Sequence, residues 1–259
     1  LKEKINEPHL YNCLYGFRSN RSTIALHAGG GAVNAKPITL DGIHFRSKLE
    51  ARWYLFFKKL GWNVVYEPEI EGLTGWIPDF LIIGDGFKTL VDVKPIDTEK
   101  EWEDSYWKHN YKDEKHVSSE KIIRKTHKDY NKIMNSGIKD LPQYELLILG
   151  TNLQLDGDNG FGVLYERMIS HDLDEAVDLK DIHKAAECMF VGDEDKKIGF
   201  FSAEQSWTCK ITGDGGKIYK YREEGSDGKF FKKIDTMWNE SWSQLQWKPH
   251  KQTIRWQWR

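Results

Sequence analysis

The stretch WIPDFLIIGDGFKTLVDVK, from Trp76 to Lys94, decides the fold of this chain. Two β-prone runs, Trp76–Ile83 and Lys88–Val93, flank the turn-forming residues Gly84-Asp85-Gly86-Phe87 and predict a β-hairpin. If Asp85-Gly86 forms a two-residue loop, Gly84 pairs with Phe87 across the hairpin. The residue numbers of every such cross-strand pair then add up to 171. A four-residue loop gives the same sum. The predicted register therefore does not depend on the turn type.

This register places two carboxylates opposite each other, those of Asp79 and Asp92, with Lys94 on the same face of the sheet. Directly opposed Cβ atoms lie about 4.5–5.5 Å apart, where two like charges destabilise a sheet unless a cation or a proton lies between them. Hard oxygen ligands with open positions suit Mg²⁺ or Mn²⁺. In the alternative interpretation, Asp79 caps the turn after Pro78, and Asp92 and Lys94 lie on a solvated ladder.

A helix is predicted upstream, over Ser47–Leu60, because apolar residues recur at helical spacing and Gly61 supplies the stop. Its first turn carries a third carboxylate, Glu50. Ser47 and Glu50 fit the capping box, in which the glutamate at the third helical position bonds back to the cap amide. Glu50 also borders the apolar stripe of the helix, so its carboxylate is equally placed to point at the sheet. These residues alone leave both roles open.

Further elements extend this pattern in both directions. A strand is predicted over Asn63–Tyr66, a second helix over Ser118–Asn135 and a buried strand over Tyr144–Leu149, which gives the order α-β-β-β-α-β. After Gly150 we predict a strand, a short helix and four further strands, at Gly162–Arg167, Leu179–Met189, Ile198–Phe201, Trp207–Thr212, Lys217–Arg222 and Phe230–Ile234. The sequence thus predicts an N-terminal arm (1–40), an α/β core with a mixed sheet flanked by helices (41–150) and a β-rich accessory module (151–259).

Composition excludes several classes of protein. The 259 residues include 38 Lys and Arg against 40 Asp and Glu, so net charge alone suggests no partner. The longest apolar runs are far shorter than the ~20 residues that span a bilayer, and no signal segment is evident, so we expect no membrane association. The three cysteines form no disulfide framework, which favours a cytoplasmic protein. No nucleotide-binding glycine motif, serine elbow or zinc-protease motif is present.

Basic residues cluster in two segments. Residues 105–139 carry 9 basic against 4 acidic side chains, and residues 216–259 carry 10 against 5. In the first segment, four basic residues at helical spacing could hold phosphates: Lys121, Arg124, Lys125 and Lys128. In the second, bases alternate with tryptophans, as at Trp247, Lys248 and Arg255, a pattern that suits base stacking with phosphate contact. The alternatives are an ordinary solvated helix face and tryptophans that pack a small β module.

Together these motifs resemble the PD-(D/E)XK nuclease superfamily, in particular a phage-type, resolvase-like branch. The resemblance covers about residues 41–150. It rests on Ser47-Lys48-Leu49-Glu50-Ala51-Arg52-Trp53, Tyr66-Glu67-Pro68-Glu69, Pro78-Asp79-Phe80 and Asp92-Val93-Lys94, in that order. It implies a restriction-endonuclease-like αβββαβ core.

The resemblance also implies roles for particular residues. Asp79 and Asp92 would ligate Mg²⁺ or Mn²⁺, with the Val93 carbonyl as a neutral ligand. Glu50 would bind metal directly or through water, and Lys94 would orient or deprotonate the attacking water. Glu67 and Glu69 are reserve candidates for the site.

The cysteines add one comparison with this branch, whose members often carry a zinc-ribbon-like insertion. Cys188 and Cys209 each lack the second cysteine of a C-x-x-C pair. Because two thiolates cannot form a closed four-ligand site by themselves, we expect a degenerate ribbon without structural zinc.

The sequence therefore predicts a metal-dependent DNA endonuclease, with RNA open as a substrate. A junction resolvase for branched DNA is one alternative, and it would be expected to form a homodimer. A nucleic-acid-binding protein that keeps the nuclease fold without catalysis is the other. If the chain is phage-encoded, its compartment is the cytoplasm of the bacterial host.

Overall fold

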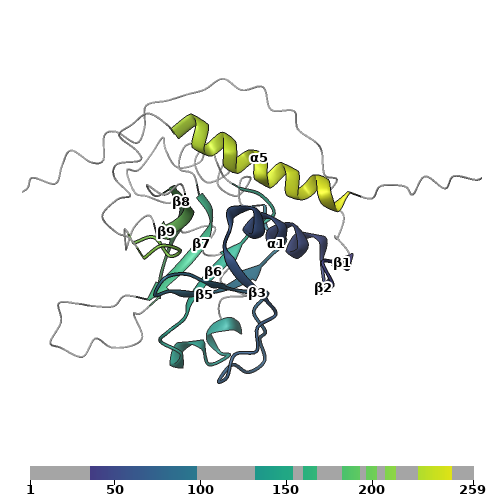
Figure 1. Ribbon diagram of the computed structural model, residues 1–259. Helices are drawn as coiled ribbons and strands as arrows, with labels where there is room; N and C mark the ends of the chain where they lie inside the picture. The colour runs from purple at the N-terminus through teal and green to yellow at the C-terminus, as the bar shows by residue number, and fades with distance from the viewer. Residues whose placement is uncertain are drawn as a thin grey trace, which may run out of the picture.

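The computed structural model describes residues 36–97, 132–153, 160–167, 183–192, 197–202, 208–213 and 227–246. Within these ranges the chain forms an α/β fold with a mixed sheet, so the predicted fold class is confirmed at this level. Helices α1 (Lys48–Leu60) and α5 (Asp227–Leu245) lie side by side on one face of the sheet (Figure 1). A short ladder of β1 (Ile38–Leu40) and β2 (Ile43–Phe45) precedes α1, so the last residues of the predicted arm are paired as a strand.

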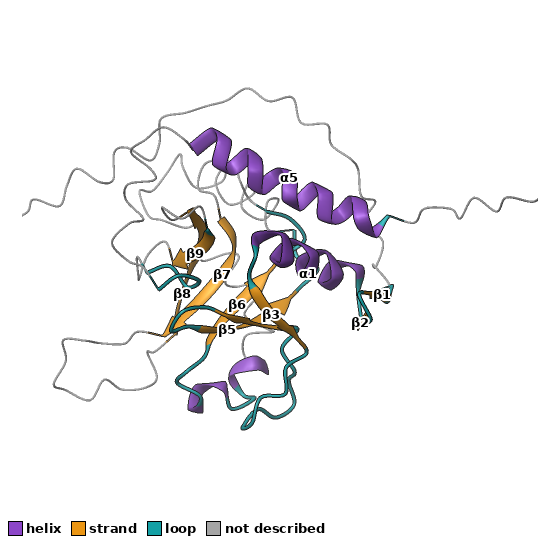
Figure 2. Cartoon of the chain, viewed as in Figure 1, coloured by secondary structure: helices purple, strands orange, loops and turns teal. Residues whose placement is uncertain are grey.

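The main sheet has seven strands in the order of the chain. They are β3 (Asn63–Tyr66), β4 (Phe80–Ile83), β5 (Lys88–Val93), β6 (Glu145–Leu149), β7 (Gly160–Arg167), β8 (His183–Gly192) and β9 (Ile198–Ser202). Neighbouring strands are antiparallel, except that β5 and β6 are parallel. A parallel pair needs a crossover connection. The described end of that connection, residues 132–140, lies on the sheet face opposite α1 and α5 (Figure 2).

The hairpin register predicted from the turn is confirmed. Phe80 pairs with Val91 and Ile83 with Lys88, so opposed residues of β4 and β5 sum to 171. The turn closes through a hydrogen bond from the Gly84 amide to the Phe87 carbonyl, with an N···O distance of 3.0 Å. β4 begins at Phe80 rather than at Trp76, so Asp79 lies directly before the ladder.

Alternation along the strands divides the core into two clusters. In β5, Val91 packs under α1 and α5, whereas Leu90 faces the other side, against Ile133 and Ile138. β6 divides in the same way, because Leu147 and Leu149 face the helices and Leu146 and Ile148 face away from them. Both faces of β5 and β6 are therefore buried, as expected for strands that meet in a parallel pair.

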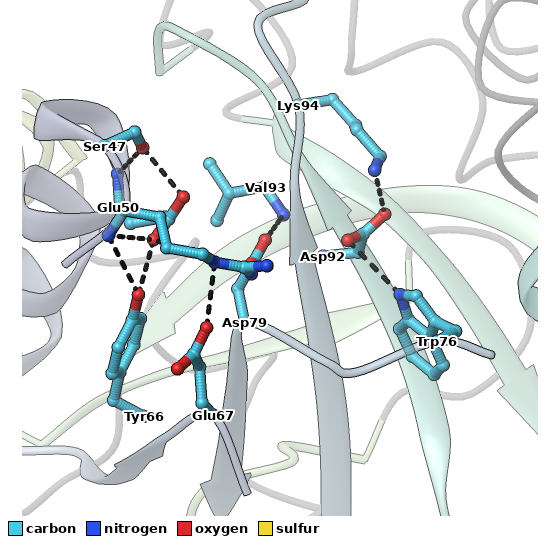
Figure 3. A network of polar contacts seen from close by, with 10 residues as sticks. Ser47, Glu50, Tyr66, Glu67, Trp76, Asp79, Asp92, Val93 and Lys94 are labelled. Carbon is cyan, nitrogen blue, oxygen red and sulfur yellow. Dashed lines mark hydrogen bonds and ion pairs between the residues drawn. The ribbon is translucent and has the colours of Figure 1, made fainter. Parts of the chain in front are cut away.

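Helix α1 begins and ends where the sequence predicts. Ser47 is its N-cap, and the Ser47 hydroxyl accepts a hydrogen bond from the Glu50 amide (3.1 Å). Gly61 ends the helix with a φ of 77°, the left-handed conformation that glycine adopts most easily. The first turn of α1 thereby holds Glu50 at the end of the sheet where β5 ends (Figure 3).

The structure corrects the predictions for the C-terminal part of the chain. The boundary expected at residue 150 does not divide the sheet, because β7, β8 and β9 continue it from β6. The helix predicted over Leu179–Met189 is wrong, since His183–Gly192 forms strand β8. The strand predicted over Trp207–Thr212 is also wrong, because its described residues, 208–212, form no strand and turn at 210–212.

The strand predicted over Phe230–Ile234 lies instead inside helix α5. Its apolar residues continue as Ile234, Trp238 and Leu245, which are all buried and recur at helical intervals. The strand predicted over Lys217–Arg222 lies outside the described residues. Of the second predicted helix, residues 132–134 are helical and the part before residue 132 is likewise outside them.

The two described cysteines belong to different clusters. Cys188 packs in the cluster beneath α1 and α5, and Cys209 packs with Met189 and Val191 in a separate, small cluster. Met189 directly follows Cys188 in β8, so consecutive side chains of that strand face opposite ways. This placement does not resemble a shared zinc-ribbon site. Within the ranges that the structure describes, neither α1 nor α5 has the length and apolar character of a transmembrane helix.

Candidate active site

The N-terminus of α1 provides a buried carboxylate with several donors around it. Glu50 accepts hydrogen bonds from the Ser47 hydroxyl (2.9 Å), the Tyr66 hydroxyl (2.7 Å) and the Arg46 amide (3.2 Å). The Tyr66 ring packs against the ring of Phe45. The pKa of its hydroxyl is raised to about 12, mainly by burial. The Tyr66 hydroxyl therefore stays protonated and donates to Glu50. The Ser47 hydroxyl caps the helix as predicted, but the amide that donates to the Glu50 carboxylate is that of Arg46, one residue before the cap, rather than the Ser47 amide of a capping box.

Asp79 lies where β4 meets the end of β5. Its Oδ2 accepts from the Val93 amide (2.6 Å) and its Oδ1 is 2.5 Å from an Arg46 guanidinium nitrogen. The residue is only 5% exposed. Its pKa is raised to about 7, chiefly by burial and also by the charges of Asp92 and Glu50, while the Val93 amide and Arg46 act in the opposite direction. The charged form of Asp79 is therefore disfavoured mainly by burial and, beyond that, by the two neighbouring carboxylates.

Asp92 and Lys94 form an ion pair at the same end of β5. Lys94 Nζ is 2.8 Å from Asp92 Oδ2, and the indole nitrogen of Trp76 donates to Asp92 Oδ1 (3.4 Å). This pair bears out the prediction that the two side chains share a face of the strand. In Figure 3 the Asp92 carboxylate turns toward Lys94 and Trp76, while Asp79 meets the Val93 backbone on the side of Glu50. The predicted residues thus gather at one sheet end as two adjoining groups.

Sequence reasoning missed Arg46, which links the carboxylates of the first group. Its Nε is 2.8 Å from Glu67 Oε1 and 4.0 Å from Glu50 Oε2, and its Nη2 contacts Asp79. The sequence carries one signal for this role, the position of Arg46 directly before the N-cap of a helix. The N-terminal end of a helix carries partial positive charge and disfavours a cation. A cation at that position therefore indicates acidic partners close by.

Of the two reserve glutamates, only Glu67 contacts the site among the described residues. Glu69 is exposed. Glu67 has a φ of 44°, a conformation that non-glycine residues adopt rarely and at some cost in energy. Its amide donates to the Asp79 carbonyl (2.9 Å), which ties it to the start of β4.

The donor set suits a hard divalent cation by its chemistry but not by its present arrangement. Glu50, Asp79 and Asp92 offer buried carboxylate oxygens, the ligand type that Mg²⁺ and Mn²⁺ prefer. As they stand, no three His, Cys, Asp or Glu side chains of the described ranges gather closely enough to hold a metal. A cation bound by these groups would compete with Arg46 for Asp79 and with Lys94 for Asp92.

The residues predicted to contact nucleic acid lie outside the described ranges. These are Lys121, Arg124, Lys125, Lys128, Trp247, Lys248 and Arg255. Their roles stay predictions from the sequence.

Comparisons of the chain with protein-family models, with curated proteins and with solved structures find no match.

Proposed function

We propose that the chain is a metal-dependent nuclease that hydrolyses phosphodiester bonds in DNA, with Mg²⁺ or Mn²⁺ as its cofactor. The observation that carries the proposal is the position of Asp79 and of the Asp92–Lys94 ion pair at the same end of the β4–β5 hairpin, beside Glu50 from α1. The fold gives support through the order α1-β3-β4-β5, a crossover and β6 parallel to β5, which is compatible with a restriction-endonuclease-like core.

The residues have distinct roles in this proposal. A bound divalent cation supplies a water of lowered pKa and neutralises charge on the phosphate. Asp79, Asp92 and the Val93 carbonyl would hold it, and Glu50 would add a ligand directly or through water. Lys94 Nζ lies 2.8 Å from Asp92 and its side chain is partly exposed, so it is placed to donate to a water or phosphate oxygen beside that carboxylate.

A second candidate is a nucleic-acid-binding protein without catalysis. It is favoured by one observation: the carboxylates are already bound by positive groups of the chain, Arg46 and Lys94. In such a protein these ion pairs are permanent parts of the structure, and the raised pKa of Asp79 is a cost of folding rather than a sign of cation binding.

A cleavage assay distinguishes the two candidates. The purified chain is incubated with linear, supercoiled, four-way-junction and single-stranded DNA and with RNA, each in Mg²⁺, Mn²⁺ or EDTA. The proposal expects cleavage of at least one DNA substrate in either metal and none in EDTA. Cleavage confined to the junction would favour a resolvase. Binding without cleavage on every substrate would overturn the proposal and support the second candidate.

A further inference from the structure

Arg46 differs from the carboxylates around it in its exposure to solvent. The Arg46 side chain is 52% exposed, whereas those of Glu50 and Asp79 are almost completely buried. Its guanidinium therefore lies at the mouth of the candidate site, with the carboxylates behind it. A purely structural counter-ion for a buried acid would gain most from being buried with it, because screening by water weakens an exposed pair.

The guanidinium also keeps hydrogen-bonding capacity toward solvent. An arginine side chain has five N–H donors in a fixed planar fork. Among the described residues, Nε contacts Glu67 and Nη2 contacts Asp79, while Nη1 makes no hydrogen bond or ion pair. The same fork binds the two oxygens of a phosphate group as readily as it binds those of a carboxylate.

Glu67 holds the guanidinium on its outer side. It reaches Arg46 from a backbone in the left-handed region, with a φ of 44°, and its own side chain is more than one-third exposed. Strained backbone of this kind concentrates at functional sites, where the surrounding structure maintains it. An exposed ion pair contributes little stability, so exchanging Glu67 for another anion costs little.

We propose that Arg46 is a phosphate-binding residue of this site, held by Glu67 and Asp79 until a backbone phosphate of the nucleic acid takes the place of Glu67. The inference rests on the proposed function, since it assigns to Arg46 the recognition of the same substrate. It also accounts for the charges of the site, where four carboxylates meet two cations: Glu50, Glu67, Asp79 and Asp92 against Arg46 and Lys94. Without an exposed cation, this end of the sheet would repel a nucleic-acid backbone.

The test measures DNA binding separately from cleavage. All variants are made in a Lys94→Ala background, and the binding of a short fluorescent DNA duplex in Mg²⁺ is followed by anisotropy over a salt series. Arg46→Gln is expected to weaken binding about tenfold and to lower the slope of log K against log salt by about 1, as for one lost phosphate contact. Arg46→Lys keeps the charge but not the fork, so it should restore the slope with only part of the affinity.

Two further variants serve as a control and as an independent readout. Lys58→Gln removes an exposed cation from the last turn of α1, about 12 Å along the helix axis from Glu50, and should change binding less than twofold. Glu67→Gln removes the competing anion and should strengthen binding about threefold, but only while Arg46 is present. If Arg46→Gln does not fold, Arg46→Lys takes its place in this comparison, and the gain from Glu67→Gln should be smaller in that background.

The outcomes separate this inference from the proposed function. An unchanged affinity and salt slope in folded Arg46→Gln would overturn it, as would a gain from Glu67→Gln that persists without Arg46. Either result would leave cleavage by the wild-type chain, and so the proposed function, untouched. If the Lys94→Ala parent binds no DNA and the wild type cleaves none, the proposed function fails and this inference fails with it.

Discussion

Asp79 is the residue whose environment says most about the site. It is buried, and its pKa is raised from 3.8 to about 7, mainly by that burial and also by the charges of Asp92 and Glu50. The folded chain therefore holds a proton on Asp79 at pH values where the unfolded chain has released it. This tighter proton binding stabilises the fold fully below about pH 4, and the stabilisation is lost as the pH rises from about 4 through about 7.

Asp79→Asn should remove this pH dependence in the metal-free protein. Asparagine resembles the protonated carboxyl, so in EDTA at pH 8 the variant should be more stable than the wild type by on the order of 2 kcal/mol. At pH 4 the two should be nearly equal. The measurement is the free energy of unfolding by urea across this range, with the exposed Asp140→Asn as the control. A wild type that becomes more stable relative to Asp79→Asn between pH 5 and pH 8 would contradict the assigned environment.

Glu50 lies in the capped first turn of α1 and beside the site. Ser47→Ala removes the side chain that caps α1 and should cost about 1 kcal/mol of stability while leaving most activity. Glu50→Gln keeps the shape of the side chain but removes its charge. Under the proposed function it should lower the cleavage rate at least tenfold, with partial recovery at higher Mn²⁺, because weakened metal binding can be offset by concentration. Cleavage rates against metal concentration for both variants test this, and a larger loss of activity in Ser47→Ala would favour capping alone.

The site was predictable from the sequence wherever a local rule fixes geometry. The turn at Asp85-Gly86 sets the hairpin register, which in turn places Asp92 and Lys94 at one strand end. Arg46 was not predictable in this way. Its partners Glu67 and Asp79 lie 21 and 33 positions later in the chain, and only the folded sheet brings them to it.

At the scale of elements, α5 packs on α1 although the two helices lie near opposite ends of the described part of the chain. Trp238 of α5 lies 4.5 Å from Trp53 and 5.2 Å from Phe56, measured between ring centroids, and the Arg52 guanidinium stacks 3.6 Å from its ring. Burial lowers the pKa of Arg52 to about 10, although Asp235 of α5 acts to raise it. The aromatic ring therefore helps to hold a partly desolvated cation between the two helices.

Trp238→Ala should destabilise the chain strongly. Trp238 is 4% exposed, and removing a buried indole typically costs about 3–5 kcal/mol. Trp242→Ala is a matched control on the same helix, because Trp242 is 43% exposed and should lose less than about 1 kcal/mol. Thermal and urea unfolding of both variants measure the difference. Equal losses in the two variants would show that α5 does not pack on α1 through Trp238.

Local patterns predicted the elements well only where they were long or sharply bounded. Helix α1 was clear because thirteen residues follow one period between Ser47 and Gly61. The run Phe230–Ile234 alone predicts a strand, because five residues are too few to separate the period of a strand from that of a helix. Its continuation through Trp238 to Leu245 carries the helical signal, and the buried face exists only because α1 lies opposite.

At the scale of the whole molecule, β6 explains why the sheet continues beyond residue 150. All five of its residues are buried, so both of its edges need a partner, and β7 covers the edge that β5 does not. The sequence shows that β6 is apolar but does not show which later strand pairs with it. Pairing between distant strands is set by the assembled core rather than by local preference.

The separation of the cysteines leads to a prediction about metal content. Because Cys188 and Cys209 pack in different clusters, the purified chain should contain no stoichiometric zinc. Elemental analysis after exhaustive dialysis measures this directly. One zinc per chain, retained on dialysis and lost together with the fold in chelator, would contradict the prediction.

The most direct test of the central claim compares two lysines of strand β5. Lys94 follows the strand at the candidate site, and Lys88 begins the same strand at its other end. With Mg²⁺ or Mn²⁺ and the DNA substrate that the wild type cleaves, Lys94→Ala should lower the rate at least about a hundredfold, while Lys88→Ala keeps the wild-type rate. Circular dichroism would verify that both variants fold. Wild-type cleavage by Lys94→Ala, or cleavage by the wild type in EDTA, would contradict the assignment of a metal-dependent nuclease site to this end of the sheet.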